Sequence, residues 1–139
     1  MGGAMDWDAW ARKVEAAVDM RTRGDWQGLF APGAHFADPA QSTGDLRAVA
    51  RGTRDVFPDW NQEVTRIRGG DDWAFFEWIG RATYALPGGG PGVAIEMRGA
   101  TVVEVDDAGL VTSWRDYLDR KEPEEQIRRA AKAAGAAPS

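Results

Sequence analysis

The chain has 139 residues, and its 17 Lys and Arg against 22 Asp and Glu give a net charge of −5. With 43% hydrophobic and 28% charged residues, the composition is typical of a folded globular protein and not of a disordered or membrane-spanning one. The acidic balance argues against nucleic acid as a partner. Cysteine is absent and His35 is the single histidine, which excludes disulfide frameworks, thiolate nucleophiles and multi-histidine metal sites.

The length fits one domain over residues 1–139, and its ends, 1–5 and 134–139, are expected to be flexible. The opening MGGAMD lacks the positive and apolar regions of a signal peptide. No apolar run approaches the length of a membrane span. We therefore expect a cytoplasmic protein with no membrane partner.

The first quarter of the chain predicts two helices. The first begins after Asp6, a favourable N-cap residue, and ends at Gly24. Asp25 caps a second, short helix, and the dipeptide Pro32-Gly33 then breaks the chain. The apolar residues of the first helix recur at helical spacing: Trp7, Trp10, Val14, Ala17 and Val18.

A short strand and a third helix come next. The strand covers residues 35–40 and ends at Pro39, because proline cannot donate to a sheet. A polar loop follows over 41–44. The third helix covers residues 45–56 and is ended by Pro58.

After Pro58 the helical period gives way to alternation. Strands are predicted over residues 61–68, 73–86, 93–105 and 110–119, with glycine-rich or Asp-Gly turns between them, and a terminal helix opens near Pro123. Helices followed by consecutive strands with short turns predict an α+β fold with a mostly antiparallel sheet. The concave face of that sheet can close over the N-terminal helices and enclose a pocket.

Alternation also predicts which side chains face that pocket. In strand 93–105 the odd positions are the apolar ones, so Glu96 and Arg98 point outward. In strand 73–86 the even positions are the apolar ones. The side chains expected to contact a bound substrate are Phe36, Phe76, Trp78, Tyr84, Met97, Thr101 and Trp114.

Two acids share the predicted interior. Asp116 alternates in phase with Trp114, and Asp38 alternates in phase with Phe36. A buried carboxylate is costly unless it is paired, hydrogen-bonded or protonated. Two carboxylates in one apolar pocket form an acid–base arrangement, since burial can keep one protonated. The structural alternatives are a turn cap for Asp38 and a salt bridge to an arginine for Asp116.

The helix–helix–strand start that ends in FADP (residues 36–39) resembles the nuclear-transport-factor-2-like superfamily. The segment GLVTSWRDYLDRKEPEEQI (109–127) resembles the SnoaL-like polyketide cyclase and limonene-epoxide hydrolase branches. The resemblance covers residues 7–127. It implies a cone-shaped α+β fold, with N-terminal helices packed on a curved sheet.

The resemblance also implies chemistry for both acids. SnoaL-like cyclases work without a cofactor and use an aspartate to move a proton during an intramolecular aldol closure. Ketosteroid isomerases carry their base at the Asp of a similar x-D-P stretch, which matches Asp38. Limonene-epoxide hydrolases carry an aspartate in a similar WRDYFD stretch, which matches Asp116.

The chain also departs from two of these patterns. The epoxide hydrolases need an Arg-x-Asp on the strand before the hairpin, where this chain has Trp78 to Arg81 and no Asp. Ketosteroid isomerases need a tyrosine on the first helix, which is missing here, and an acid where this chain has Thr101.

We therefore predict a SnoaL-like cyclase or isomerase without metal or cofactor, acting on a small, apolar, oxygenated substrate. Asp116 would be the general acid/base and Asp38 the partner carboxylate. The alternatives are an epoxide hydrolase or epoxide-opening cyclase, and a non-catalytic binding module whose pocket is filled by its own aromatic side chains. A homodimer is expected through the outward sheet face, where Val102 and Tyr117 lie.

Overall fold

The computed structural model describes residues 5–135. One six-stranded sheet has the order β2-β1-β6-β5-β4-β3, in which β1 and β6 run parallel and all other neighbours antiparallel. The predicted α+β class and mostly antiparallel sheet are confirmed. The elements are α1 (Trp7–Val18), the 3-10 helices η1 (Met20–Thr22) and η2 (Gln27–Leu29), β1 (Phe30–Ala37), β2 (Ser42–Thr43), α2 (Leu46–Val56), β3 (Asn61–Gly69), β4 (Trp73–Tyr84), β5 (Val93–Val105), β6 (Val111–Leu118) and α3 (Lys121–Gly135).

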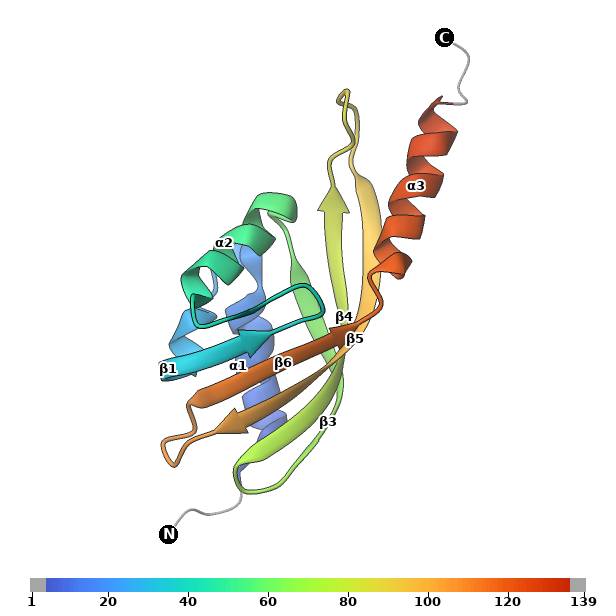
Figure 1. Ribbon diagram of the computed structural model, residues 1–139. Helices are drawn as coiled ribbons and strands as arrows, with labels where there is room; N and C mark the ends of the chain where they lie inside the picture. The colour runs from blue at the N-terminus through green and yellow to red at the C-terminus, as the bar shows by residue number, and fades with distance from the viewer. Residues whose placement is uncertain (1–4, 136–139) are drawn as a thin grey trace.

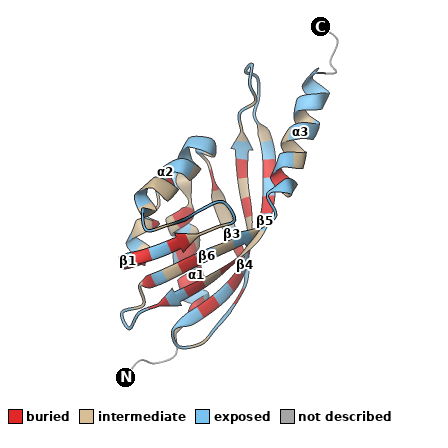
Figure 2. Ribbon diagram, viewed as in Figure 1, coloured by how far each residue is buried: buried red, intermediate tan, exposed pale blue. Residues whose placement is uncertain are grey.

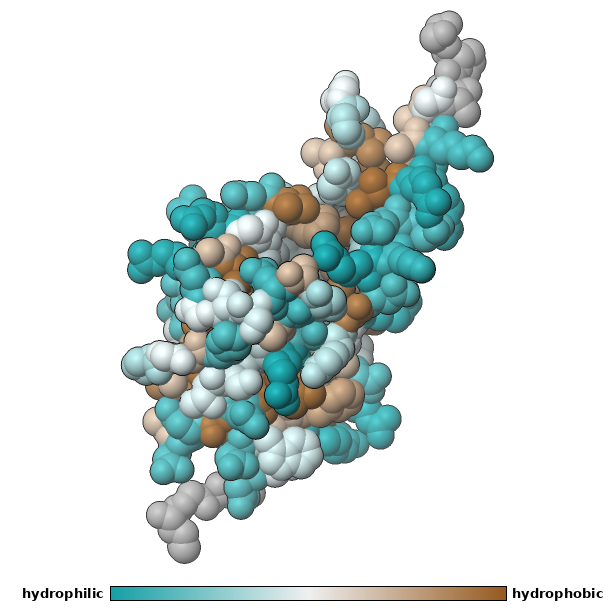
Figure 3. Space-filling view, in the orientation of Figure 1, coloured by the Kyte–Doolittle hydropathy of each residue, from teal (hydrophilic) through white to brown (hydrophobic). Residues whose placement is uncertain are grey.

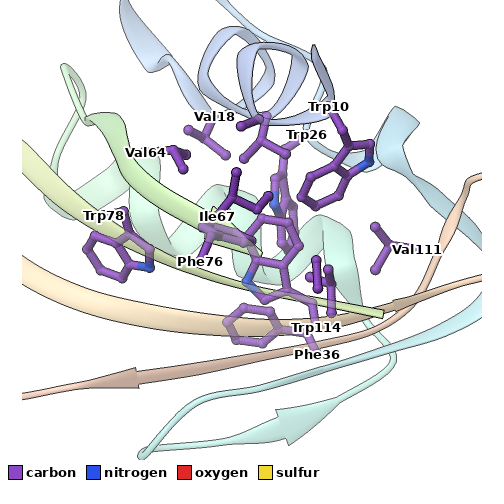
Figure 4. Close-up of a cluster of buried hydrophobic side chains, with 14 of the residues drawn as sticks. Trp10, Val18, Trp26, Phe36, Val64, Ile67, Phe76, Trp78, Val111 and Trp114 are labelled. Carbon is purple, nitrogen blue, oxygen red and sulfur yellow. The ribbon is translucent and has the colours of Figure 1, made fainter. Parts of the chain in front are cut away.

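The sheet is strongly curved, and α1 and α2 lie on its concave side, whereas α3 stands beside the free end of β5 (Figure 1). The core lies between α1 and the sheet, where Trp10, Phe76 and Trp114 are buried (Figure 4). Their rings meet edge to face, with centroids 5.8 Å apart for Trp10–Phe76 and 5.6 Å for Phe76–Trp114. Buried and exposed residues alternate along β4 and β5 (Figure 2), as a half-buried sheet requires.

Helix side chains bond to the sheet at two places where a strand lacks a neighbour, the edge strand β3 and the start of β5. On α1, Glu15 accepts a 2.8 Å hydrogen bond from the backbone N–H of Val64 in β3. On α3, Glu122 accepts from the N–H of Arg98 at 2.9 Å, and Gln126 both accepts from and donates to the backbone of Glu96. These bonds satisfy backbone groups that an unpaired edge would leave free. They fix α3 beside β5.

The structure corrects the predicted ends of the first two helices. Helix α1 ends at Val18 and not at Gly24, because Asp19 turns to an extended conformation and its carboxylate accepts from the N–H of Arg21. A single 3-10 turn follows. The helix predicted after Asp25 is likewise only the 3-10 turn η2, because Phe30 already begins β1.

Two strands differ from their predicted form because each contains a bulge. Pro32 and Gly33 do not break the chain but lie inside β1, where the register with β6 shifts between Phe30 and His35. In β6, Val111 pairs with Val105 and Ser113 with Glu104. Simple alternation predicts that Thr112 shares the inner face with Trp114. Thr112 is instead an exposed bulge residue.

The ends expected to be flexible, 1–5 and 134–139, fall largely outside the described residues. Within them, Met5 packs against the core and residues 134 and 135 belong to α3. None of the helices between residues 5 and 135 is long and apolar enough to cross a membrane.

Candidate active site

A pocket of about 500 Å³ opens between α2, the concave face of the sheet and the start of α3. Apolar surface lies between the end of α2 and α3 on the face shown in Figure 3, with hydrophilic side chains around it. The pocket walls are mostly aromatic and aliphatic, and its volume lies in the range of small-molecule sites. The lining includes Trp26, Phe36, Phe57, Trp60, Trp78, Met97, Trp114 and Leu118.

Both predicted acids line this pocket, together with four of the seven side chains expected to contact substrate. Phe36, Trp78, Met97 and Trp114 form part of its wall. The other three do not reach it. Phe76 is fully buried between Trp10 and Trp114, so it is core. Tyr84 packs edge to face against Phe57, and Thr101 lies fully buried behind Asp116.

Asp116 is held by two hydrogen bonds to the same carboxylate oxygen. The Thr101 hydroxyl lies 2.6 Å from Oδ1, and the Trp114 indole Nε1 lies 2.8 Å from it. The indole of Trp78 donates in turn to the Thr101 hydroxyl at 2.8 Å. An indole N–H can only donate, so the Thr101 oxygen must accept from Trp78 and direct its own proton to Asp116.

This arrangement makes the two oxygens of Asp116 unequal. Oδ1 accepts two fixed donors, so a proton placed there would have to displace one of them. Oδ2 has no hydrogen-bond partner among the described residues. When the carboxyl is neutral, its proton therefore sits on Oδ2, the oxygen left free to exchange it with a ligand.

The surroundings raise the pKa of Asp116 to about 6. Burial is the largest cause, because it disfavours the charged form, and the charge of Asp38 adds to it. The hydrogen bonds from Thr101 and Trp114 act in the opposite direction. The side chain is half-buried and lines the pocket. A pKa of about 6 lets both protonation states exist near neutral pH, as a general acid/base needs.

Asp38 stands at the mouth of the same pocket but is held differently. Its Oδ1 accepts from the backbone N–H of Ala40 at 2.7 Å and of Gln41 at 2.9 Å, which closes the turn after β1. The turn-capping role and the pocket-lining position are therefore both present. Asp116 has no arginine partner among the described residues, so its salt-bridge alternative is wrong.

Sequence reasoning missed the α2 wall and several polar lining residues, of which Gln62 is the one on the sheet. Its side chain lines the pocket and accepts a 3.1 Å hydrogen bond from Trp60 Nε1. The signal was present in the sequence, since Gln62 alternates in phase with the buried Val64. The bulge in β3 between Val64 and Arg66 hides that phase from a reading of the whole strand.

A second, open depression of about 410 Å³ lies by the bulged part of β1 and the start of α2. The only acid that lines it, Asp45, is the N-cap of α2 and accepts from the N–H of Ala48 at 3.0 Å. It offers no group placed for chemistry, so the pocket around Asp116 is the candidate active site.

The family model described as SnoaL-like domain matches residues 7–114, which is most of the chain. The chain belongs to this SnoaL-like domain family. The match includes α1, α2, five complete strands and the first half of β6, up to Trp114, whereas Asp116, Leu118 and α3 lie beyond it. No curated protein matches the chain in sequence.

Solved structures share the fold of this SnoaL-like domain at low identity. IdmH of Streptomyces antibioticus, a proposed polyketide cyclase, has a TM-score of 0.72 at 19% identity, over 89% of this chain and 99% of its own. AclR of Streptomyces galilaeus, a proposed hydroxylase, has a TM-score of 0.72 at 17% identity, over 88% and 95%. A Catenulispora acidiphila protein with a ketosteroid isomerase-like fold, solved with trimethylamine, has a TM-score of 0.67 at 16% identity, over 88% and 91%. They show the predicted nuclear-transport-factor-2-like architecture.

Metal-binding side chains do not gather in this SnoaL-like domain. Between residues 5 and 135, no three His, Asp or Glu side chains lie close enough together to hold an ion. His35 is exposed on β1 and bonds to the Ser42 hydroxyl, away from the pocket lining. The groups available for chemistry in the pocket are therefore carboxylates, amides and one arginine at the rim, Arg120.

Proposed function

We propose that this SnoaL-like domain is a cofactor-independent enzyme of the polyketide cyclase or isomerase type, in which Asp116 moves a proton at Oδ2. The observation that carries the proposal is the carboxyl group of Asp116, whose Oδ2 is left free of hydrogen bonds in an apolar pocket. Burial there raises its pKa to about 6. The substrate is a small, mostly apolar molecule with a carbonyl group, which acidifies a neighbouring C–H bond.

In the charged form, Asp116 Oδ2 takes a proton from the carbon next to that carbonyl. The new enolate then attacks a second carbonyl of the same molecule in a cyclase, or is reprotonated at another carbon in an isomerase. The protonated Asp116 returns its proton to the product, so the carboxylate is regenerated and no outside reagent is consumed. Proton transfer of this kind contributes about 10²- to 10⁴-fold, and the aromatic walls add positioning.

Two further features support an enzyme. The pocket exceeds the roughly 300 Å³ lower bound for ligand sites, at about 500 Å³, although Trp78 and Trp114 stand in its wall. Asp38 lines the same pocket, and its charge adds to the effect of burial in raising the pKa of Asp116. We propose Asp38 as this electrostatic partner carboxylate.

The presence of two half-buried carboxylates, Asp38 and Asp116, also favours a second candidate, an epoxide hydrolase or epoxide-opening cyclase. There the protonated Asp116 would donate to the epoxide oxygen, while Asp38 activates a water molecule or an internal hydroxyl. Hydrolysis of a small panel of terpene and polyketide epoxides, followed by mass spectrometry, separates this candidate from the first.

Deuterium exchange tests the first candidate without knowledge of the natural substrate. The protein should accelerate exchange of the C–H bonds next to the carbonyl of 2-tetralone in D₂O, measured by NMR. Asp116→Asn should abolish the acceleration. Asp119→Asn, the same change on an exposed residue outside the pocket, should keep it. Equal exchange by the protein and its Asp116→Asn variant would contradict the mechanism.

A further inference from the structure

Three of the four tryptophans that line the pocket donate hydrogen bonds to side chains in or behind its wall. Trp78 donates to the Thr101 hydroxyl, and Trp114 donates to Oδ1 of Asp116. The third, Trp60, donates to Oε1 of Gln62 at 3.1 Å. An amide can turn end over end, but an indole nitrogen never accepts. Gln62 must therefore present its oxygen to Trp60, and this leaves its NH₂ group as the free end.

The position of Trp60 is itself fixed by packing. It is 7% exposed, and its six-membered ring fills the space in which a Cβ on Gly80 would lie, with Cη2 only 2.2 Å from that position. The ring also meets Trp78 edge to face, with centroids 6.1 Å apart. A fixed indole gives Gln62 a fixed direction, since a rigid donor holds its acceptor in one rotamer.

Elimination among the other polar groups singles out Gln62. Four polar side chains other than tryptophan are half-buried in the pocket: Asp38, Thr53, Gln62 and Asp116. The Thr53 hydroxyl donates to the carbonyl of Val49. Asp38 and Asp116 are carboxyl groups, which accept when charged. Gln62 alone among these four has N–H groups that bond to nothing in residues 5–135.

Gln62 and Asp116 lie at opposite ends of the pocket wall. On the sheet, Asp116 pairs with Thr101 in β5, whereas Gln62 pairs with Gly80, which in turn pairs with Met97 of β5. The two rows are four residues apart on β5, roughly 13 Å along the strands, and β6 and β3 are three strand spacings apart, roughly 14 Å across them. Trp78 and Met97 line the wall between them, so the space that joins the two polar ends is apolar.

We propose that Gln62 is a second substrate-binding residue, which donates a hydrogen bond from Nε2 to a carbonyl or ether oxygen at the end of the substrate remote from Asp116. The substrate class that fits is an elongated molecule of two or more rings, with its reacting group at one end and an oxygen acceptor at the other. This inference rests on the proposed function for the role of Asp116, but the Gln62 contact stands on its own geometry.

Two matched probes test the inference. The first is 4-acetyl-4′-hydroxybiphenyl, whose phenol can donate to Asp116 and whose ketone oxygen can accept from Gln62. The second is 4-isopropenyl-4′-hydroxybiphenyl, in which a CH₂ group replaces the ketone oxygen at nearly the same shape. Calorimetric titration of the natural chain should give a preference for the ketone of about fivefold, as one neutral hydrogen bond provides.

Variants then separate the two ends of the site. Gln62→Leu and Gln62→Glu should both remove the ketone preference and leave the affinity for the isopropenyl probe within about twofold. Gln62→Glu is the sharper change, because it keeps the acceptor for Trp60 and turns the free end from donor to acceptor. Trp60→Phe should reduce the preference in part, since Gln62 can then turn. Gln41→Leu, the same change at the exposed rim, should keep the preference.

The outcomes distinguish this inference from the proposed function. Asp116→Asn should lower the affinity for both probes equally. If it does not, only the proposed role of Asp116 is contradicted, and the Gln62 inference is unaffected. No ketone preference in the natural chain, or a preference that survives Gln62→Leu, overturns the Gln62 inference. Loss of the ketone preference in Gln41→Leu would mean that the ketone oxygen binds at the rim, and this would also overturn the Gln62 inference.

Discussion

The six-membered ring of Trp78 occupies the space in which a Cβ on Gly99 of the neighbouring strand would lie, with Cζ2 only 2.3 Å from that position. The two residues are direct partners across β4 and β5. Only glycine lets this indole lie against the sheet and reach Thr101 with its N–H. The orientation of the carboxyl at Asp116 therefore begins with a missing side chain two residues before Thr101.

Gly99→Ala should consequently disturb both stability and the site. The added methyl must displace Trp78, and such overpacking costs about 1–3 kcal/mol. Urea denaturation at pH 7 measures the change in the free energy of unfolding. Gly52→Ala is the control, because a Cβ at Gly52 in α2 meets no atom within 4 Å and alanine favours a helix by about 1 kcal/mol over glycine. Equal effects of the two substitutions would contradict the packing argument.

Thr101→Val should raise the pKa of Asp116 further. Valine keeps the shape of threonine but removes the hydroxyl that donates to Oδ1, so the charged carboxylate loses one of its two stabilising bonds. The acid limb of the rate–pH profile for deuterium exchange should move to higher pH. Thr101→Ser keeps the hydroxyl and should keep the limb in place. A limb that moves equally in both variants would mean that packing, not the hydrogen bond, sets the pKa.

Much of this site could be predicted from alternation alone. Trp78, Met97, Trp114 and Asp116 stand on clean two-residue periods next to apolar neighbours, which is why the structure finds them on the pocket wall. Alternation gives the face of a residue but not its depth. Phe76 and Thr101 share the inner face with Trp78, yet they lie farther along the sheet, beneath α1 and behind Asp116.

Gln62 and the wall of α2 could not be found in this way. The bulge of β3 changes the phase of the strand within three residues of Gln62, and the face that α2 presents depends on packing between distant segments. The hydrogen bonds of Asp38 to Ala40 and Gln41 are local and follow from the x-D-P sequence. The proximity of Asp38 to Asp116, in contrast, depends on the parallel pairing of β1 with β6. A local sequence pattern does not reveal that pairing.

Stability should depend on pH through Asp116. Its pKa in the folded chain is about 6, against an ordinary value of 3.8, so the folded state binds more protons than the unfolded state between these values. The protonated carboxyl therefore adds at most about 3 kcal/mol to the free energy of unfolding. This contribution is fully present below about pH 4 and is lost as the pH rises through about 6. Solvent screening of this half-buried carboxyl reduces that amount.

Asp116→Asn isolates this effect from all other titrating groups. The asparagine oxygen can accept from Thr101 and Trp114 while its NH₂ group takes the place of Oδ2, and it never becomes charged. Urea denaturation should show the variant more stable than the natural chain at pH 8, with the difference shrinking towards pH 4.5. A difference that is constant over this range would mean that Asp116 has an ordinary pKa.

Asp38→Asn should separate charge from chemistry at the pocket mouth. The asparagine oxygen can still accept from Ala40 and Gln41, so the turn is kept. Removal of the negative charge should lower the pKa of Asp116, and the acid limb of the exchange profile should move to lower pH while catalysis persists. Complete loss of exchange, as in Asp116→Asn, would instead assign Asp38 a direct part in proton transfer.

The outer face of the sheet should form a homodimer interface. Among the described residues, Trp73, Phe75 and Tyr117 are large apolar side chains that remain 48%, 40% and 56% exposed. The alternation of buried and exposed residues along β4 and β6 places all three side chains on the convex face of the sheet. On that face Phe75 pairs with Val102, and Tyr117 pairs with Ala100, across adjacent strands. Exposed large apolar side chains gathered on one face are typical of a protein–protein interface, and a second copy offers the same face related by a two-fold axis.

Analytical ultracentrifugation should therefore find a dimer. Phe75→Glu, which places a charge at the centre of the patch, should shift the equilibrium towards monomer, because an unpaired charge in the contact would have to be desolvated. Val56→Glu is the matched control, since Val56 on α2 is 51% exposed but lies on the opposite side of the sheet. A monomeric natural chain, or a dimer that tolerates Phe75→Glu but not Val56→Glu, would remove the convex face as the interface.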